Sequence, residues 1–286
     1  MNTISVKEWL DQFLEIQKQR DLDPKTIAEK VYLANYINKR IGNRPLNIIR
    51  TLDLYMIIDE YIQQTKQNTA VRMYLLIKQS FHTAWSRGII ENNPACRLER
   101  PECKVKRERL NIDEFLKILK IAQLCAPEYL YIGMLVALVS GRRLCEIVNI
   151  SMDDIKDNYL NIQTAKKGVI VSLPLDLKLE AIGTSLRDLF IMTRGKKYLI
   201  EREGPKPRVT PNSLSTWFSR MREASGIVAT DGRTPPTFYE IRSLSALLYN
   251  EQGIDIKKLL GHRSVSSTLI YTDRRGKGDF KFILEI

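Results

Sequence analysis

Histidine and cysteine are scarce in this chain. It has two histidines and four cysteines, namely His82, His262, Cys96, Cys103, Cys125 and Cys145. No two cysteines form a CxxC pair, and the distant histidines complete no zinc-binding pattern with them. The same spacings make a poor disulfide framework, which favours a protein kept in a reducing compartment. We therefore expect a cytoplasmic protein without a structural metal.

Long apolar runs are missing as well. No stretch approaches the roughly 18–20 consecutive apolar residues that a membrane-spanning helix needs. The first residues, MNTISVKEWLDQF, lack the basic segment followed by an apolar segment that marks a secretory signal. The sequence therefore predicts neither a membrane partner nor export.

Basic residues, by contrast, are in excess. The 286 residues include 45 lysines and arginines against 33 aspartates and glutamates, which gives a formal net charge of +12. Such an excess favours a polyanionic partner, most often nucleic acid. Charge alone leaves open a protein that is merely basic, so the motifs have to decide.

The first hundred residues have the pattern of a helical bundle. Asp23 followed by Pro24 predicts a helix start, and the apolar spacing after it continues to Gly42. A further helix is expected over residues 69–88. The apolar side chains of that helix that we expect in the core are Tyr74, Leu75, Ile77, Phe81 and Trp85.

A charged stretch, RLERPECKVKRERL, separates this bundle from the rest of the chain. It has almost no apolar spacing, which predicts an extended linker rather than a loop inside one domain. We expect a helical domain at 1–100, a linker at 101–109 and a second domain at 110–286. The second domain should be largely helical, starting with an Asn111–Glu114 capping box.

One part of the second domain has strand character. The stretch YLNIQTAKKGVIVSLPL reads as a β-hairpin with Lys166 and Lys167 at its tip. The apolar helix PEYLYIGMLVALV before it should be buried and should end at Gly141. The expected fold class is therefore mainly α, with a small antiparallel sheet in the second, α+β domain.

Two expected helices place polar side chains three residues apart, on one face of the helix. Arg143 and Glu146 share a face in SGRRLCEI, and Tyr239 and Arg242 share the face opposite the apolar side of TFYEIRSLSALLY. Each pair alone is compatible with an ordinary surface salt bridge or a solvated arginine.

Together, five residues supply what phosphoryl transfer without a metal requires. Arginine forks bind phosphate oxygens, lysine can protonate a leaving alkoxide, histidine titrates near neutrality and tyrosine can act as a nucleophile. The chain presents these groups in the order Arg143, Lys166, Arg242, His262 and Tyr271.

That order and its surroundings resemble the tyrosine recombinase family, and closely the lambdoid phage integrases. The likeness rests on SGRRLCEI, TAKKGVIVSLPL, TFYEIRSLSALLY, LLGHRS and the YTDRRGKG that begins at Tyr271. Each motif is weak alone, but five in order reinforce one another. The resemblance implies site-specific DNA recombination for prophage integration or excision.

The resemblance also implies a role for each residue. Arg143 and Arg242 would clamp the scissile phosphate, with Glu146 orienting Arg143. Lys166 would protonate the 5′-hydroxyl leaving group. His262 would bond a non-bridging oxygen or assist the nucleophile.

Tyr271 would attack and form a 3′-phosphotyrosine link, so that no metal or cofactor is required. The implied partners are duplex DNA at phage and host attachment sites, three further copies of the chain in a tetramer, and accessory DNA-bending and directionality proteins. The implied location is the nucleoid in a bacterial host cytoplasm.

The chain departs from the family pattern in two ways. Tyr239 occupies the slot where the family usually has histidine, and a phenol accepts protons poorly at pH 7. Tyr239 is also a rival nucleophile, disfavoured by its place in that slot. Second, Met1 lies almost at the start of the core-binding domain, so the chain resembles a core-binding and catalytic pair without the arm-binding module.

Three alternatives remain open at this point. A type IB topoisomerase would share the chemistry, but it would not pair it with a short helical core-binding domain. A DNA-binding remnant could have lost cleavage through Tyr239. A basic helical regulator would not explain the ordered motifs. A nicked DNA substrate separates the second from an active enzyme, because only the enzyme is trapped covalently.

Overall fold

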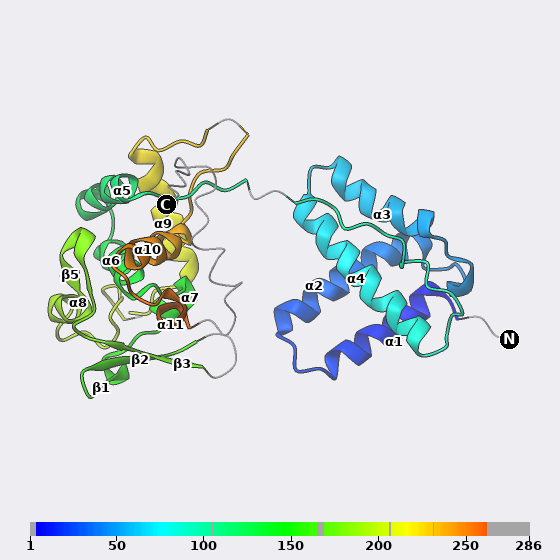
Figure 1. The fold of residues 1–286 in the computed structure, drawn as a ribbon, viewed down its shortest axis with the longest axis horizontal. Coiled ribbons are helices and arrows are strands. Elements are labelled where there is room, and N and C mark those ends of the chain that lie inside the picture. Colours follow the sequence, from blue (N-terminus) through cyan, green and yellow to red (C-terminus); the bar gives the residue numbers. More distant parts are fainter. Residues whose placement is uncertain (1–3, 104–105, 165–168, 206, 231, 262–286) are drawn as a thin grey trace, which may run out of the picture. The chain divides into compact units, whose positions relative to one another are not determined.

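The chain forms two compact units, Met1–Val105 and Lys106–Ile286 (Figure 1). The computed structural model describes residues 4–103, 106–164, 169–205, 207–230 and 232–261. The boundary at residue 105 falls inside the stretch that we expected to be a linker. Each unit has its own hydrophobic core.

The first unit is a helical bundle built around Trp9, Phe13, Ile37 and Phe81, whose side chains are fully buried. Its elements are α1 Val6–Lys18, α2 Pro24–Ile41, the short 3₁₀ helix η1 Leu46–Ile48, α3 Thr51–Gln63 and α4 Gln67–Ser86. Asp23 caps α2 by accepting from the backbone of Lys25, as the sequence predicts.

Helix α4 has part of the expected core on its exposed side. Ile77 and Phe81 are fully buried, but Leu75 and Trp85 are 52% and 47% exposed. The inward face of α4 follows Ala70, Met73, Ile77, Phe81 and Ala84. Leu75 and Trp85 share the outward face with His82, at separations of seven and three residues. Their size suggested burial, but the helical repeat places them outside.

The second unit consists mostly of helices around a single buried one. Its helices are α5 Ile112–Cys125, α6 Glu128–Ser140, α7 Leu144–Ile147, α8 Leu186–Met192, α9 Pro211–Ala224, α10 Glu240–Glu251 and α11 Ile256–Leu260, with 3₁₀ turns η2 Met152–Asp154 and η3 Glu180–Ile182. α6 packs against α5, α8, α9 and α10, so it is apolar on every side. Gly133 lets α9 approach, because a Cβ there would lie 2.9 Å from a methyl of Leu214.

In the described residues, the strands form two small antiparallel sheets. The larger has the order β1 Ile155–Lys156, β2 Tyr159–Gln163 and β3 Ile170–Pro174, and the smaller pairs β4 Lys178–Leu179 with β5 Thr184–Ser185. α11 packs on β3. The expected fold class, mainly helical with a small antiparallel sheet, is confirmed. In the part of the chain that is described, no helix is long and apolar enough to span a membrane.

Candidate active site

Arg143 and Glu146 meet where α6 gives way to α7. Arg143 is the N-cap residue of α7, and its backbone amide donates to Glu146 Oε2 at 3.0 Å. Its guanidinium Nη1 donates to the other carboxylate oxygen, also at 3.0 Å. Glu146 is only 4% exposed. One buried carboxylate therefore holds both the backbone amide and the guanidinium of Arg143. Arg143 and Glu146, three residues apart, lie on the same side of the chain, as the sequence predicts.

The Glu146 carboxyl stays ionised in this setting. Burial raises its pKa, but the backbone amide of Arg143, the charge of Arg142 and the guanidinium of Arg143 together lower the pKa below its usual value. Glu146 is thus a fixed anion that can hold an arginine in one orientation.

Arg242 is a buried arginine that joins the carboxyl ends of α6 and α11. Its guanidinium donates from Nη1 to Gly141 O at 2.6 Å and from Nη2 to Leu260 O at 3.0 Å. The side chain is 2% exposed. The helical pattern placed Arg242 on the face opposite the apolar side, where an arginine is usually solvated, but the structure buries it. α10 packs against both α6 and α11, and the two carbonyls that Arg242 reaches belong to the ends of those helices.

Arg142 was not singled out from the sequence, although it belongs to the Arg-Arg pair at the helix break. It is 1% exposed. Nη2 donates to the carbonyl oxygen of Leu259, and Nε donates to Ser140 O at 3.4 Å. Burial, followed by repulsion from Arg242, lowers its pKa to about 9. At neutral pH the side chain therefore remains a cation.

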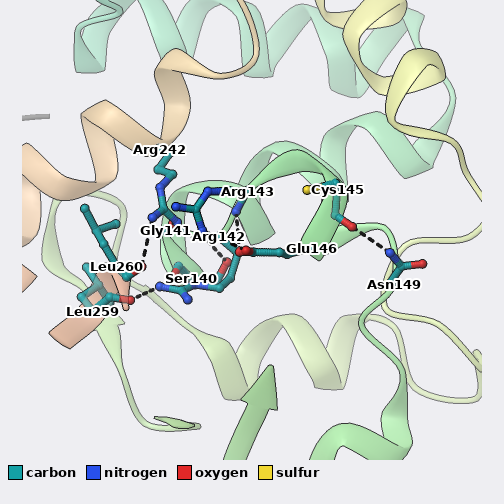
Figure 2. Close-up of polar contacts among 10 residues, drawn as sticks. All are labelled: Ser140, Gly141, Arg142, Arg143, Cys145, Glu146, Asn149, Arg242, Leu259 and Leu260. Carbon is teal, nitrogen blue, oxygen red and sulfur yellow. Dashed lines mark hydrogen bonds and ion pairs between the residues drawn. The ribbon is translucent and has the colours of Figure 1, made fainter. Parts of the chain in front are cut away.

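The three arginines converge on one place, although they come from two segments of the chain (Figure 2). In the described part, the charges that act on Arg142 are those of Arg242, Arg143 and Glu146, so positive charge exceeds negative there. Guanidinium groups bind phosphate oxygens through paired donors. The arrangement therefore suits a phosphate group.

Tyr239 lies at the entrance of α10. It is the N-cap residue of the helix, its backbone oxygen accepts from the amide of Arg242 at 3.2 Å, and its side chain is 40% exposed. The phenol is therefore accessible to a substrate, one turn from the buried guanidinium.

A buried ion pair holds α10 to the start of the second unit. Arg109 Nη1 donates to Glu240 Oε2 at 2.8 Å and also to Ser243 Oγ. Arg107 lies 3.8 Å from the other oxygen of Glu240, which is 1% exposed. Sequence reasoning missed this pair, because its members are separated by 131 positions and no local pattern links them.

Three residues of the expected set, Lys166, His262 and Tyr271, lie outside the described residues. Described residues that flank Lys166 and His262 in the sequence lie close together in space. A Cβ on Gly261, the residue before His262, would lie 2.6 Å from Val171 and 3.6 Å from Thr164, on the two arms of the hairpin that carries Lys166. The same Cβ would lie 3.8 Å from Arg142 Nη1.

Metal-binding groups do not gather in the described part of the chain, where no three His, Cys, Asp or Glu side chains could share an ion. All four cysteines fall in that part, and each is free and exposed.

Comparison with known proteins gives matches to both units. Residues 6–101 match the phage integrase central domain, and residues 108–277 match the phage integrase family. The integrase of Enterobacteria phage P21 is 35% identical over 96% of this chain and 76% of its own length.

Solved structures agree. A lambda integrase dimer bound to a COC′ core site has a TM-score of 0.89 and 30% identity, over 99% of this chain and 81% of that chain. A lambda integrase tetramer bound to a Holliday junction has a TM-score of 0.90 and 29% identity, over 99% and 82%.

The two matched ranges take in nearly all of the described residues, and Arg143, Glu146, Tyr239 and Arg242 fall within the second. This chain therefore belongs to the phage integrase family of tyrosine-type site-specific DNA recombinases.

Proposed function

We propose that this recombinase integrates and excises a prophage by cutting and rejoining duplex DNA through a 3′-phosphotyrosine intermediate. The observation that carries the proposal is the convergence of guanidinium groups held by protein partners, with Arg143 held by Glu146 and the buried Arg242 held by Gly141 O and Leu260 O. Donors fixed in this way need no reorganisation when charge develops on a phosphate.

In the proposed reaction, Arg143 and Arg242 bind the non-bridging oxygens of the scissile phosphate. The Tyr271 hydroxyl gives up its proton to water or to the group that assists it, and its oxygen attacks phosphorus while the bond to the 5′ oxygen breaks. Lys166 gives its proton to the departing 5′ oxygen, and His262 bonds a non-bridging oxygen or assists the nucleophile. Tyr239, at the histidine slot, donates a hydrogen bond to the phosphate.

Rejoining reverses these steps with a different 5′-hydroxyl. The phosphodiester energy is kept in the link to tyrosine, so the cycle consumes no nucleotide and uses no cofactor or metal. The proton that Lys166 gave up returns to it when the new 5′-hydroxyl attacks.

The proposed assembly is a homotetramer on two duplexes, in the nucleoid of the bacterial cytoplasm, with accessory DNA-bending and directionality proteins as further partners. We propose that residues 1–100 bind core-type DNA, that 101–109 link the two domains, and that 110–286 carry the chemistry. The support is the two-unit division and the lambda integrase structures on a core site and on a Holliday junction.

The test uses candidate attachment-site duplexes with a nick just 3′ of the cut, which release a short fragment and prevent rejoining. We expect the unchanged protein to give a covalent adduct that maps to Tyr271. Tyr271→Phe should give none while binding DNA nearly as well, because binding contacts come from elsewhere. The matched control is Tyr159→Phe, since Tyr159 is an exposed tyrosine of β2.

Each other outcome has a definite meaning. An adduct formed by Tyr271→Phe would refute the nucleophile. Binding without any adduct from the unchanged protein would favour a catalytically impaired DNA-binding remnant. A type IB topoisomerase is not favoured, because both units match phage integrases.

A further inference from the structure

We propose that Arg142 is a positioning residue of the recombination reaction, which fixes the carboxyl end of α11, and with it the chain entering His262, beside the phosphate-binding arginines. The inference rests on the proposed function. It assigns to Arg142 a role distinct from those of Arg143 and Arg242, because Arg142 acts through the backbone rather than on the phosphate.

Arg142 connects the carboxyl end of α6 to that of α11 through hydrogen bonds. Arg142 follows Gly141, where α6 ends with φ of 62°, and its own Nε turns back to Ser140 O. Its Nη2 donates to the carbonyl of Leu259. Arg242 donates to the next carbonyl, that of Leu260. Two guanidinium groups therefore hold the last two carbonyls of α11 (Figure 2).

α11 depends on such anchoring. It has five residues, and a helix that short has no stability of its own in water. Its place is therefore set by tertiary contacts at its ends. Asp255 caps the first turn by accepting from Lys257 and Lys258. Arg142 and Arg242 hold the other end, and His262 follows two residues after Leu260 along the chain.

Arg142 also lies near the place where Gly261 meets the hairpin. Its Nη1 lies 3.8 Å from where a Cβ on Gly261 would be, and that same point is in contact with Thr164 and Val171. The guanidinium thus lies near the end of α11, close to Thr164 and Val171 on either side of the β2–β3 connection. A shift of this side chain would move the approach to His262 relative to the hairpin.

A purely structural tie would not need a charge here. Nη1 of Arg142 is buried and finds no hydrogen-bond partner among the described residues. Burial and the charge of Arg242 both oppose the cation, so a neutral side chain would be easier to bury. A cation at this point strengthens the bond to Leu259 O, because a charged donor makes a stronger hydrogen bond than a neutral one.

The experiment compares Arg142→Gln and Arg142→Lys with a matched control, Arg222→Gln. Arg222 on α9 is also a buried arginine, 7% exposed, whose Nη1 donates to a backbone carbonyl, that of Pro236, at 2.9 Å. The readouts are melting temperature and single-turnover cleavage of the nicked duplex at saturating protein.

We expect Arg142→Gln to slow cleavage by about 10- to 100-fold, the usual effect of losing a side chain that orients a reacting group. Arg142→Lys keeps the charge but loses the planar fork of the guanidinium. Its cleavage rate should therefore lie between those of the unchanged protein and Arg142→Gln. Arg222→Gln should leave the rate unchanged, although its melting temperature falls.

A double-mutant cycle with His262→Ala separates positioning from a structural effect. If Arg142 acts through the segment that carries His262, Arg142→Gln should cost less than about threefold further once His262 is gone. Arg222→Gln combined with His262→Ala should show no coupling. Should Arg142→Gln fail to fold, Arg142→Lys takes its place in the cycle.

Full additivity of the two losses, or an unchanged rate in Arg142→Gln, would overturn the inference while the proposed function stands. An unchanged protein that forms no adduct would overturn both. The two failures are therefore distinguishable in one set of reactions.

Discussion

Arg242 on α10 donates a hydrogen bond of 2.6 Å to the carbonyl oxygen of Gly141, across 101 positions of chain. Gly141 adopts the left-handed φ of 62° at which α6 ends. The carbonyls of a helix end lack partners within the helix, and the guanidinium supplies one. The same guanidinium reaches Leu260 O at 3.0 Å. An arginine expected to bind substrate thus also joins two helix ends.

Arg242→Lys should therefore damage both stability and chemistry. Lysine lacks the planar fork whose two nitrogens reach Gly141 O and Leu260 O, so we expect one buried carbonyl to lose its partner, at about 1–3 kcal/mol in the free energy of unfolding. Cleavage should fall by about 100-fold or more. Urea unfolding and single-turnover cleavage measure the two effects. Arg187→Lys is the control, because Arg187 is 41% exposed in its pair with Asp176 and should cost at most about 1 kcal/mol. Equal losses of unfolding free energy in Arg242→Lys and Arg187→Lys would contradict the role of Arg242 in joining the two helix ends.

Gly261→Ala should cost more than Gly253→Ala. Both glycines have positive φ, 64° and 76°, which strains an alanine by about 1–2 kcal/mol. At Gly253 an added Cβ meets open space, whereas at Gly261 it would lie 2.6 Å from Val171 Cγ2. The excess should be about 1–3 kcal/mol.

Val171→Ala should remove that excess in the Gly261→Ala background and leave the backbone strain. Because Val171 is itself buried, its single variant is needed to complete the cycle. Denaturant unfolding of the four proteins gives the coupling energy. An additive cycle would show that the close approach of α11 to β3 does not matter.

Local chemistry made part of this structure predictable from the sequence. Helix caps and the three-residue spacing of Arg143 and Glu146 depend on neighbours, and the structure has them as expected. The burial of Arg242 could not be predicted in this way. Its carbonyl partners lie 101 and 18 positions away, and the helical pattern alone assigned it to the solvated side. Contacts between distant segments decide which polar residue is covered, and they have no periodic signature.

Glu146→Gln should change how stability depends on pH. The folded pKa of Glu146 is below its ordinary value, so its carboxylate stabilises the fold above the unfolded pKa of about 4.5. That contribution is lost as pH falls through the folded pKa. We expect the variant to be less stable than the unchanged protein by about 1–3 kcal/mol at pH 7. The difference should shrink below about pH 4.5. Urea unfolding between pH 7 and pH 3.5 tests this, and a difference independent of pH would contradict it.

Tyr239 permits a test of the departure from the family pattern. The residue is 40% exposed at the start of α10, one turn from Arg242, so we expect its phenol to donate to a phosphate held there. Tyr239→Phe keeps the ring but removes the donor, and cleavage should fall by up to about 100-fold. Tyr239→His restores a donor that can also accept a proton near neutral pH, so cleavage should stay the same or rise. Single-turnover rates on the nicked duplex compare the two variants, with Tyr159→Phe as the control for an exposed tyrosine elsewhere. Full activity of Tyr239→Phe would show that the slot contributes no donor. A large loss in Tyr239→His would instead show that the phenol does something that imidazole cannot replace.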